Sequence, residues 1–223
     1  MKTYTLFHSL KLTLVLLTLS LTLGVGNVWG ATYTFDCHSS TSGNGGAMTY
    51  WYSDAECNTH VCKYYSTSNP TTHYNRWSSA YTMYYKDATI TSAKTFVMCA
   101  TNSNYAYFAN GAYLIFGKTN SYLTLPTFSN EKITNIAVTT NSSVAGDVQL
   151  NVYSGSNTAS TQRTTTGSKV EVLSFDITNT YQNDELKIQI GNNKNIQLTQ
   201  IVITTAPSCT KLGQINGSFL LAR

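Results

Sequence analysis

Few side chains in this sequence are spaced in a way that supports catalysis. Nucleophilic catalysis requires a Ser or Cys beside a His and a carboxylate, but His38, His60 and His73 all lie in polar, loop-rich segments without a G-x-S-x-G turn. Glycoside hydrolysis requires two carboxylates across a cleft, and Asp54 with Glu56 is the close acidic pair among the aromatic residues. A polar turn explains this pair more simply. We therefore expect no enzyme, no cofactor and no catalytic residue.

Aromatic residues point more directly to a function. Eleven of the 16 tyrosines lie between Tyr50 and Tyr113. Sugars present C–H patches on their ring faces and hydroxyls at their edges, so a glycan-binding surface needs flat aromatic rings together with short polar side chains. Residues 74–87 combine both kinds, although core packing is the alternative because aromatic residues favour strands. The predicted ligand-binding residues are Tyr74, Trp77, Tyr81, Tyr84, Tyr85 and Asp87.

The chain contains five cysteines, which are Cys37, Cys57, Cys62, Cys99 and Cys209. In a secreted chain, cysteines are interpreted first as disulfides. The first four allow three connectivities, and we favour Cys57 with Cys62 and Cys37 with Cys99. A metal site around Cys57, His60 and Cys62 is the alternative, but this spacing matches no standard zinc pattern. We therefore predict disulfides and no metal, with Cys209 unpaired.

Residues 1–30 have the pattern of a secretory signal peptide. Lys2 and Lys11 flank a polar start, and an uncharged apolar run that is short for a membrane span follows. Val28 and Gly30 are small enough for the positions before a cleavage site, so we expect cleavage after Gly30. An N-terminal anchor helix is the alternative, but glycines soon interrupt the run. We predict a protein that is secreted or held at the cell surface, with no membrane segment beyond the signal peptide.

Charged residues are sparse. Only 11% of residues are Asp, Glu, Lys or Arg, against about 25% in ordinary soluble domains. Residues 31–205 contain ten basic and ten acidic side chains, so this body is neutral. A neutral surface without clustered cations binds phosphate backbones poorly. We therefore expect no nucleic-acid partner, and the scarcity of charge also excludes a coiled coil or a charged helical bundle.

From about residue 147 apolar residues alternate with polar ones, as Val148, Leu150 and Val152 do, which predicts strands. No helical periodicity persists, so we expect an all-β protein, with about seven strands between residues 112 and 204. On the strand near residue 81, Tyr81 and Tyr85 share one face while Tyr84 takes the other, and one face belongs to the core. The apolar positions change phase within residues 170–177 and within residues 196–203. Each change predicts a β-bulge or a strand that switches partners.

We divide the chain into a signal peptide over residues 1–30, a β-sandwich domain over 31–205, and a linker with the start of a truncated C-terminal region over 206–223. Within the domain, residues 31–110 are aromatic and loop-rich, whereas residues 111–205 hold the regular strands. The aromatic part either supplies strands to the same sandwich, which we favour, or forms a small disulfide-held subdomain. About 80 loop-rich residues alone would bury a poor core.

The regular part resembles a known group of modules. Residues 113–126 are YLIFGKTNSYLTLP, residues 131–138 are EKITNIAV, and residues 196–203 are IQLTQIVI. This pattern is similar to the jelly-roll β-sandwich modules of secreted gut-bacterial surface proteins. The resemblance implies a jelly-roll fold, a linker at residues 206–213, and an accessory carbohydrate-binding or adhesive role. It implies no calcium site, because Thr199 and Gln200 stand where calcium-binding members carry an Asp-Asp pair.

Together these observations predict a non-catalytic, jelly-roll-like antiparallel β-sandwich that binds a glycan or another cell-surface polymer. A structural or adhesive stalk that presents a C-terminal domain is the first alternative. A glycoside hydrolase is a more distant one, because it requires Asp54 or Glu56 to face a second carboxylate at about 5 Å.

Overall fold

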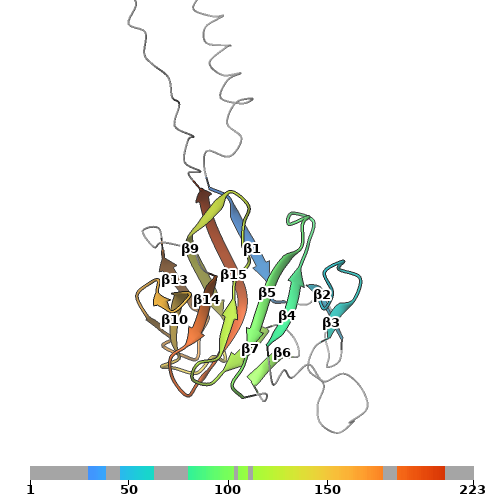
Figure 1. Ribbon diagram of the computed structural model, residues 1–223. Helices are drawn as coiled ribbons and strands as arrows, with labels where there is room; N and C mark the ends of the chain where they lie inside the picture. Colours follow the sequence, from blue (N-terminus) through green and yellow to red (C-terminus); the bar gives the residue numbers. More distant parts are fainter. Residues whose placement is uncertain are drawn as a thin grey trace, which may run out of the picture.

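The computed structural model describes residues 30–38, 46–62, 80–102, 105–109, 113–177 and 185–208. These residues form antiparallel strands and no α-helix, as the alternating apolar pattern predicts. The strands build two sheets that pack together as a β-sandwich (Figure 1). Within these residues, no helix is long and apolar enough to cross a membrane.

Sheet A contains β1 (Thr32–Asp36), β6 (Ala106–Ala109), β7 (Tyr113–Gly117), β9 (Glu131–Thr140), β13 (Val172–Asp176) and β15 (Asn195–Pro207). Its order is β13–β9–β15–β7–β6, and β1 pairs with β15 beside this path. The long strand β15 is the centre of the sheet. Strand β9 lies along one side of it, while β7 and then β1 follow each other along the other side.

Sheet B contains β2 (Ala47–Tyr52), β3 (His60–Cys62), β4 (Tyr81–Tyr85), β5 (Lys94–Cys99), β8 (Tyr122–Thr124), β10 (Gln149–Ser154), β11 (Asn157–Thr158), β12 (Arg163–Thr164) and β14 (Leu186–Ile190). Its order is β11–β10–β14–β8–β5–β4–β2–β3, and β12 also pairs with β10. The aromatic N-terminal strands therefore extend the same two sheets. From β7 to β10, consecutive strands alternate between the sheets, and β13, β14 and β15 alternate in the same way.

The core lies between the sheets and is rich in aromatic rings. Phe35, Trp51, Phe96, Phe108 and Phe116 are fully buried. The Trp51 ring lies 5.0 Å from the Phe96 ring and 5.3 Å from the Phe108 ring, measured between centroids. Burying one such side chain stabilises a fold by about 1.5–3 kcal/mol. The aromatic N-terminal part is thus a main source of stability for the whole sandwich.

The change of phase predicted within residues 196–203 is confirmed. In β15, Ile196 and Leu198 are buried at alternate positions. After Leu198 the alternation shifts by one residue, so that Ile201 and Ile203 are the next buried apolar residues. The register with β9 contains an irregularity between Leu198 and Gln200. At the same point β15 changes its other neighbour from β7 to β1. A bulge and a change of partner therefore occur together.

The change of phase predicted within residues 170–177 is wrong. Leu173, Phe175 and Ile177 are buried and keep one alternation through β13. Val170 and Val172 face solvent instead, with 60% and 64% of their surface exposed. Val170 and Val172 are apolar but exposed, so the sequence suggested buried positions that are one residue out of phase with Leu173, Phe175 and Ile177, which are the buried ones.

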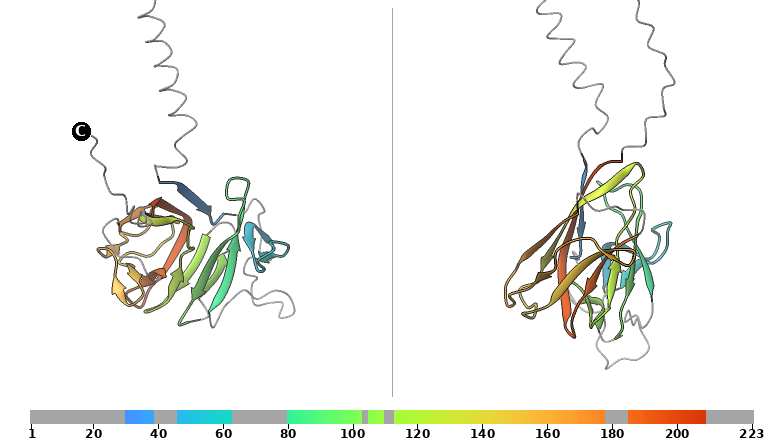
Figure 2. Two further views of the ribbon diagram at one scale, coloured as in Figure 1. Left: turned by 45° about the horizontal axis from the view of Figure 1, so that its top comes forward. Right: turned by 60° about the vertical axis from the view of Figure 1, so that its left-hand side comes forward.

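The first and last strands meet at their outer ends. The Ala31 amide donates to Oγ1 of Thr205 at 3.1 Å, and the Thr205 amide donates to the Ala31 carbonyl at 2.8 Å. The hydroxyls of Tyr33 and Thr205 both donate to Oε2 of Glu131, at the start of β9. The chain therefore enters and leaves the sandwich at one end (Figures 1 and 2). Strand β15 runs to Pro207, past the predicted domain end at residue 205.

Candidate functional site

Strand β4 divides the predicted ligand-binding rings between its two faces. Tyr85 is only 1% exposed and Tyr81 packs half-buried against the core, so both face the inside of the sandwich. Tyr84 is half-buried on the outer face of sheet B. Because the Tyr85 residue is only 1% exposed, its ring has little surface on which a sugar can stack. Tyr74 and Trp77 lie outside the described residues.

Tyr85 and Trp51 close the edge of β1 that faces away from β15. The Asp36 amide donates to the Tyr85 hydroxyl at 3.3 Å, and the Asp36 carbonyl accepts from the Trp51 indole N–H at 2.8 Å. The Tyr85 ring also packs edge-on against Phe35, with 5.1 Å between centroids. A buried backbone group without a partner costs about 1–3 kcal/mol. Two side chains from sheet B thus satisfy a strand edge of sheet A and tie the sheets together.

Asp87 shapes the turn between β4 and β5. Its Oδ1 accepts hydrogen bonds from the Thr89 amide, the Thr89 hydroxyl and the Ile90 amide, at 2.6–2.8 Å. Its Oδ2 accepts from the Tyr85 hydroxyl at 2.9 Å. Partial burial alone would raise the pKa of Asp87, but the hydrogen bonds from Ile90, Thr89 and Tyr85 outweigh it and hold the pKa below its usual value. Asp87 is therefore first a structural anchor, which its sequence position did not reveal.

A hollow of about 300 Å³ lies between the end of β1 and the turn that joins β4 to β5. We name it the Asp36 hollow, and it is lined by Thr34, Asp36, Tyr50, Tyr85, Asp87, Ala88, Thr89 and Gln200. Thr34 and Asp36 share one face of β1, and Gln200 lies directly opposite Asp36 on β15. Tyr50 leaves 36% of its surface exposed. The hollow therefore brings an accessible ring, carboxylates, hydroxyls and an amide to one place.

The two oxygens of the Asp36 carboxylate differ in their contacts with the described residues. Among the described residues, the amide and Nδ1 of His38 both bond to Oδ1 of Asp36, each at 2.8 Å. Oδ2 receives no hydrogen bond from this part of the chain. An ionised carboxylate oxygen forms strong hydrogen bonds with hydroxyl and ammonium donors. Asp36 is consequently better placed than Asp87 to contact a ligand.

Sequence reasoning predicted Tyr85 and Asp87 but missed Asp36, Tyr50 and Gln200. The missed residues come from β1, β2 and β15, which lie far apart along the chain. The alternation in Thr32–Asp36 was a signal for β1 that went unused. No local pattern, however, places the end of that strand beside residues of the β4–β5 turn.

The outer face of sheet B carries further aromatic contacts that were not predicted. Tyr52 lies directly opposite Tyr84 on β4 and opposite His60 on β3. The Tyr52 and His60 rings are 4.5 Å apart between centroids. Further along the sheet, the Lys187 ammonium lies 5.0 Å from the Tyr122 ring centroid. These rings already have partners within the fold, so this face is a weaker candidate than the Asp36 hollow.

The structure contains neither predicted disulfide. Cys37 is fully buried between the sheets, where burial raises the pKa of its thiol. Cys99 lies opposite Tyr122 on the outer face of sheet B. The two thiols are therefore on opposite sides of that sheet, and a disulfide with Cα atoms farther apart than about 7 Å cannot form without backbone movement.

The structure also contains no disulfide between Cys57 and Cys62. Cys57 has a left-handed backbone, with φ of 58°, and its Sγ is directed at the Ala55 carbonyl within its own turn. Cys62 belongs to β3, paired with Ala47. The turn and the strand thus hold the two side chains in separate positions. Cys209 lies outside the described residues.

Asp54 has structural partners within the β2–β3 loop. Asp54 accepts hydrogen bonds from the amides of Asn58 and Thr59, and these bonds, led by that of Asn58, hold the pKa of Asp54 below its usual value. Asp54 therefore organises a polar turn. In the part of the chain that the structure describes, no three His, Cys, Asp or Glu side chains converge to hold a metal ion.

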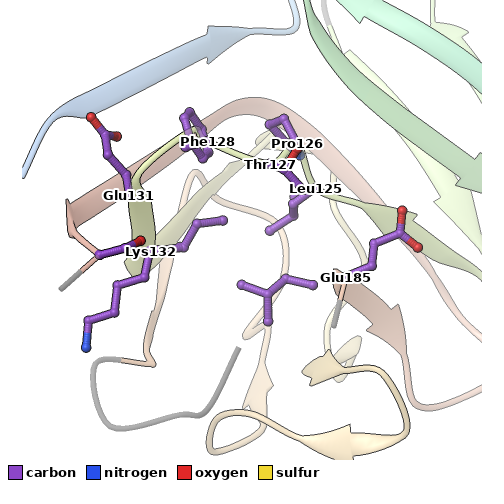
Figure 3. Close-up of a pocket in the computed structure, with 10 residues that line it drawn as sticks. Leu125, Pro126, Thr127, Phe128, Glu131, Lys132 and Glu185 are labelled. Carbon is purple, nitrogen blue, oxygen red and sulfur yellow. The ribbon is translucent and has the colours of Figure 1, made fainter. Parts of the chain in front are cut away.

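A second cavity, of about 200 Å³, lies beside the loop before β9 (Figure 3). Leu125 points toward its centre, whereas the charged ends of Glu131 and Lys132 point away (Figure 3). The Glu131 carboxylate is engaged by Tyr33 and Thr205 instead. Thr127, Glu185 and Ser208 also line the cavity, but the aromatic residue among its described lining residues, Phe128, is buried and offers no exposed ring on which a sugar can stack.

Comparison with known proteins gave no match to a family model, to a curated protein or to a solved structure. The chemistry of the described residues is therefore the basis for assigning a function.

Proposed function

We propose that this protein is a secreted or cell-surface, non-catalytic module that binds carbohydrate at the Asp36 hollow. One observation carries the proposal: Tyr50, which is 36% exposed, and Asp36 line the same hollow. A tyrosine ring provides apolar area for the C–H face of a sugar. The carboxylate accepts hydrogen bonds from sugar hydroxyls, and Gln200 and Thr34 add polar groups at the rim.

Affinity electrophoresis in gels that contain soluble polysaccharides of several classes tests this proposal. We expect at least one polysaccharide to retard the protein, and we expect Tyr50→Ala and Asp36→Asn each to reduce the retardation. Tyr153→Ala is the matched control, because Tyr153 is half-buried on the outer face of β10, in another part of the sandwich. Normal migration in every gel, or full retardation of both hollow variants, contradicts the proposal.

The jelly-roll connectivity is part of the same proposal. The alternation of β7, β8, β9 and β10 between the sheets supports it, as does the central position of β15 between β7 and β9. The signal-peptide pattern of residues 1–30 supports secretion. Cleavage after Gly30 would leave a mature chain that starts immediately before β1.

A stalk role is the second candidate, and the position of the chain ends bears on it. A stalk unit transmits the chain from one pole to the other. In this sandwich, Ala31 and Thr205 are hydrogen-bonded to each other, so the chain enters and leaves at one end. A domain attached at one end leaves the rest of its surface free, which favours a binding module over a stalk.

A further inference from the structure

We infer that the Asp36 hollow binds uncharged or amino-bearing sugars and excludes acidic ones, an inference that rests on the proposed carbohydrate binding. Two carboxylates, those of Asp36 and Asp87, belong to the lining. The described lining residues include no Lys, Arg or His. A uronate or sulfate group placed there meets charge of its own sign, and such contacts between like charges cost several kcal/mol across interfaces.

Two described lysines on or beside the β4–β5 hairpin, Lys94 and Lys86, interact with other groups. The Lys94 ammonium lies 5.6 Å from the Tyr33 ring centroid and 4.9 Å from that of Phe128, in the neighbouring cavity. The charge of Lys86 acts on the Cys57 thiol in the β2–β3 loop. Neither lysine belongs to the described lining of the hollow.

His38 is the third basic side chain near the hollow. The Nδ1 atom of His38 lies 2.8 Å from Oδ1 of Asp36. This contact involves only one of the two carboxylate oxygens of Asp36.

The negative charge of the hollow is also fixed in position. Four hydrogen bonds hold the Asp87 carboxylate, and they favour its ionised form. Asp36 sits on a strand whose backbone is secured by Tyr85 and Trp51. A preorganised anion discriminates between ligand charges without the cost of ordering a flexible side chain.

The test uses one sugar backbone in three charge forms: the neutral polysaccharide that retards the wild-type protein, its carboxymethylated derivative and its aminoethyl derivative. At low ionic strength and pH 7.5–8, we expect the carboxymethylated form to bind at least about tenfold more weakly than the neutral form. We expect the aminoethyl form to bind at least as tightly as the neutral form. The difference shrinks at high salt, because charges are screened beyond about 3 Å at 1 M.

Two variants show whether the hollow causes this selectivity. Asp36→Asn removes one carboxylate, and we expect it to narrow the difference in affinity between the three polysaccharide forms. Thr34→Lys adds a cation at an exposed position two residues before Asp36, and we expect it to favour the carboxymethylated form. Thr82→Lys, at an exposed position on the outer face of sheet B, is the matched control and leaves the selectivity unchanged.

The outcomes separate this inference from the proposed function. Equal or tighter binding of the carboxymethylated form by the wild-type protein overturns the inference and leaves carbohydrate binding in place. Unchanged selectivity in a folded Thr34→Lys protein also overturns it. Absence of retardation by every neutral polysaccharide overturns the proposed function, and the inference with it.

Discussion

Trp51 of sheet B donates its indole N–H to the backbone carbonyl of Asp36 in sheet A, with 2.8 Å between the two heavy atoms. The Tyr85 hydroxyl accepts a hydrogen bond from the Asp36 amide. At a strand edge, backbone groups would otherwise need a further strand or water as partner. The stability of β1 and the geometry of the Asp36 hollow therefore depend on the same two aromatic side chains.

Replacing Trp51 by Phe keeps an aromatic ring but removes the donor to Asp36. We expect Trp51→Phe to lower the free energy of unfolding by about 2–3 kcal/mol, because the carbonyl loses its partner and the smaller ring leaves a cavity. Urea denaturation followed by far-UV circular dichroism measures this change. Tyr84→Phe, on the outer face of the same sheet, should stay within about 0.5 kcal/mol of the wild type. Equal losses in both variants would refute the edge-closing role.

Tyr85 makes the fold sensitive to alkali. Burial raises the pKa of Tyr85 above its usual value, and the hydrogen bond to Asp87 raises it further. In the unfolded chain a tyrosine ionises near about pH 10, so the stabilisation is complete below that pH and is lost as the pH rises through the folded pKa. We expect Tyr85→Phe to be less stable than the wild type at pH 8 by about 1–2 kcal/mol.

The difference between wild type and Tyr85→Phe should shrink steadily above pH 10. Urea denaturation at half-unit steps from pH 8 to pH 11.5 provides the measurement. Taking the difference between the two proteins cancels the contribution of other tyrosines with a raised pKa, such as Tyr33 and Tyr81. A difference that is independent of pH would contradict the assignment.

Asp87 makes the β4–β5 turn sensitive to acid. Its pKa lies below the usual value, so its stabilisation is present above the unfolded pKa of about 3.9 and is lost as the pH falls through the folded pKa. We expect Asp87→Asn to destabilise the protein by about 1 kcal/mol at pH 7, a value discounted for solvent screening. The amides of Thr89 and Ile90 should exchange faster with deuterium in this variant. Asp147→Asn, at a side chain that is 85% exposed, should leave exchange at both amides unchanged.

The four described cysteines should not be joined to one another by disulfides. When the protein is denatured without a reductant, iodoacetamide should alkylate Cys37, Cys57, Cys62 and Cys99, and peptide mass spectrometry detects the modification. In the native protein, Cys37 should react last, because it is fully buried and burial raises the pKa of its thiol. A linked pair of cysteine peptides, with the summed mass of the two peptides minus two hydrogens, would instead show a disulfide.

Local pattern was sufficient for most of the strands. The alternation of Val148, Leu150 and Val152 predicted β10, because a strand on a core must bury every second residue. The shift between Leu198 and Ile201 predicted the bulge in β15 for the same reason. Alternation gave a wrong prediction in β13, because Val172 is apolar and yet exposed. Alternation shows which residues share a face, but it does not show which face is covered.

The sequence by itself determined an all-β chain with a neutral body and with its aromatic residues gathered in the N-terminal part. These properties follow from composition and from contacts between near neighbours. Only the tertiary structure decided that Tyr85 faces the core, that Cys37 and Cys99 lie on opposite sides of sheet B, and that Asp36 and Tyr50 share a hollow. The physical reason is that strands distant in the chain meet through hydrogen bonds and packing between sheets, whose partners no local spacing specifies.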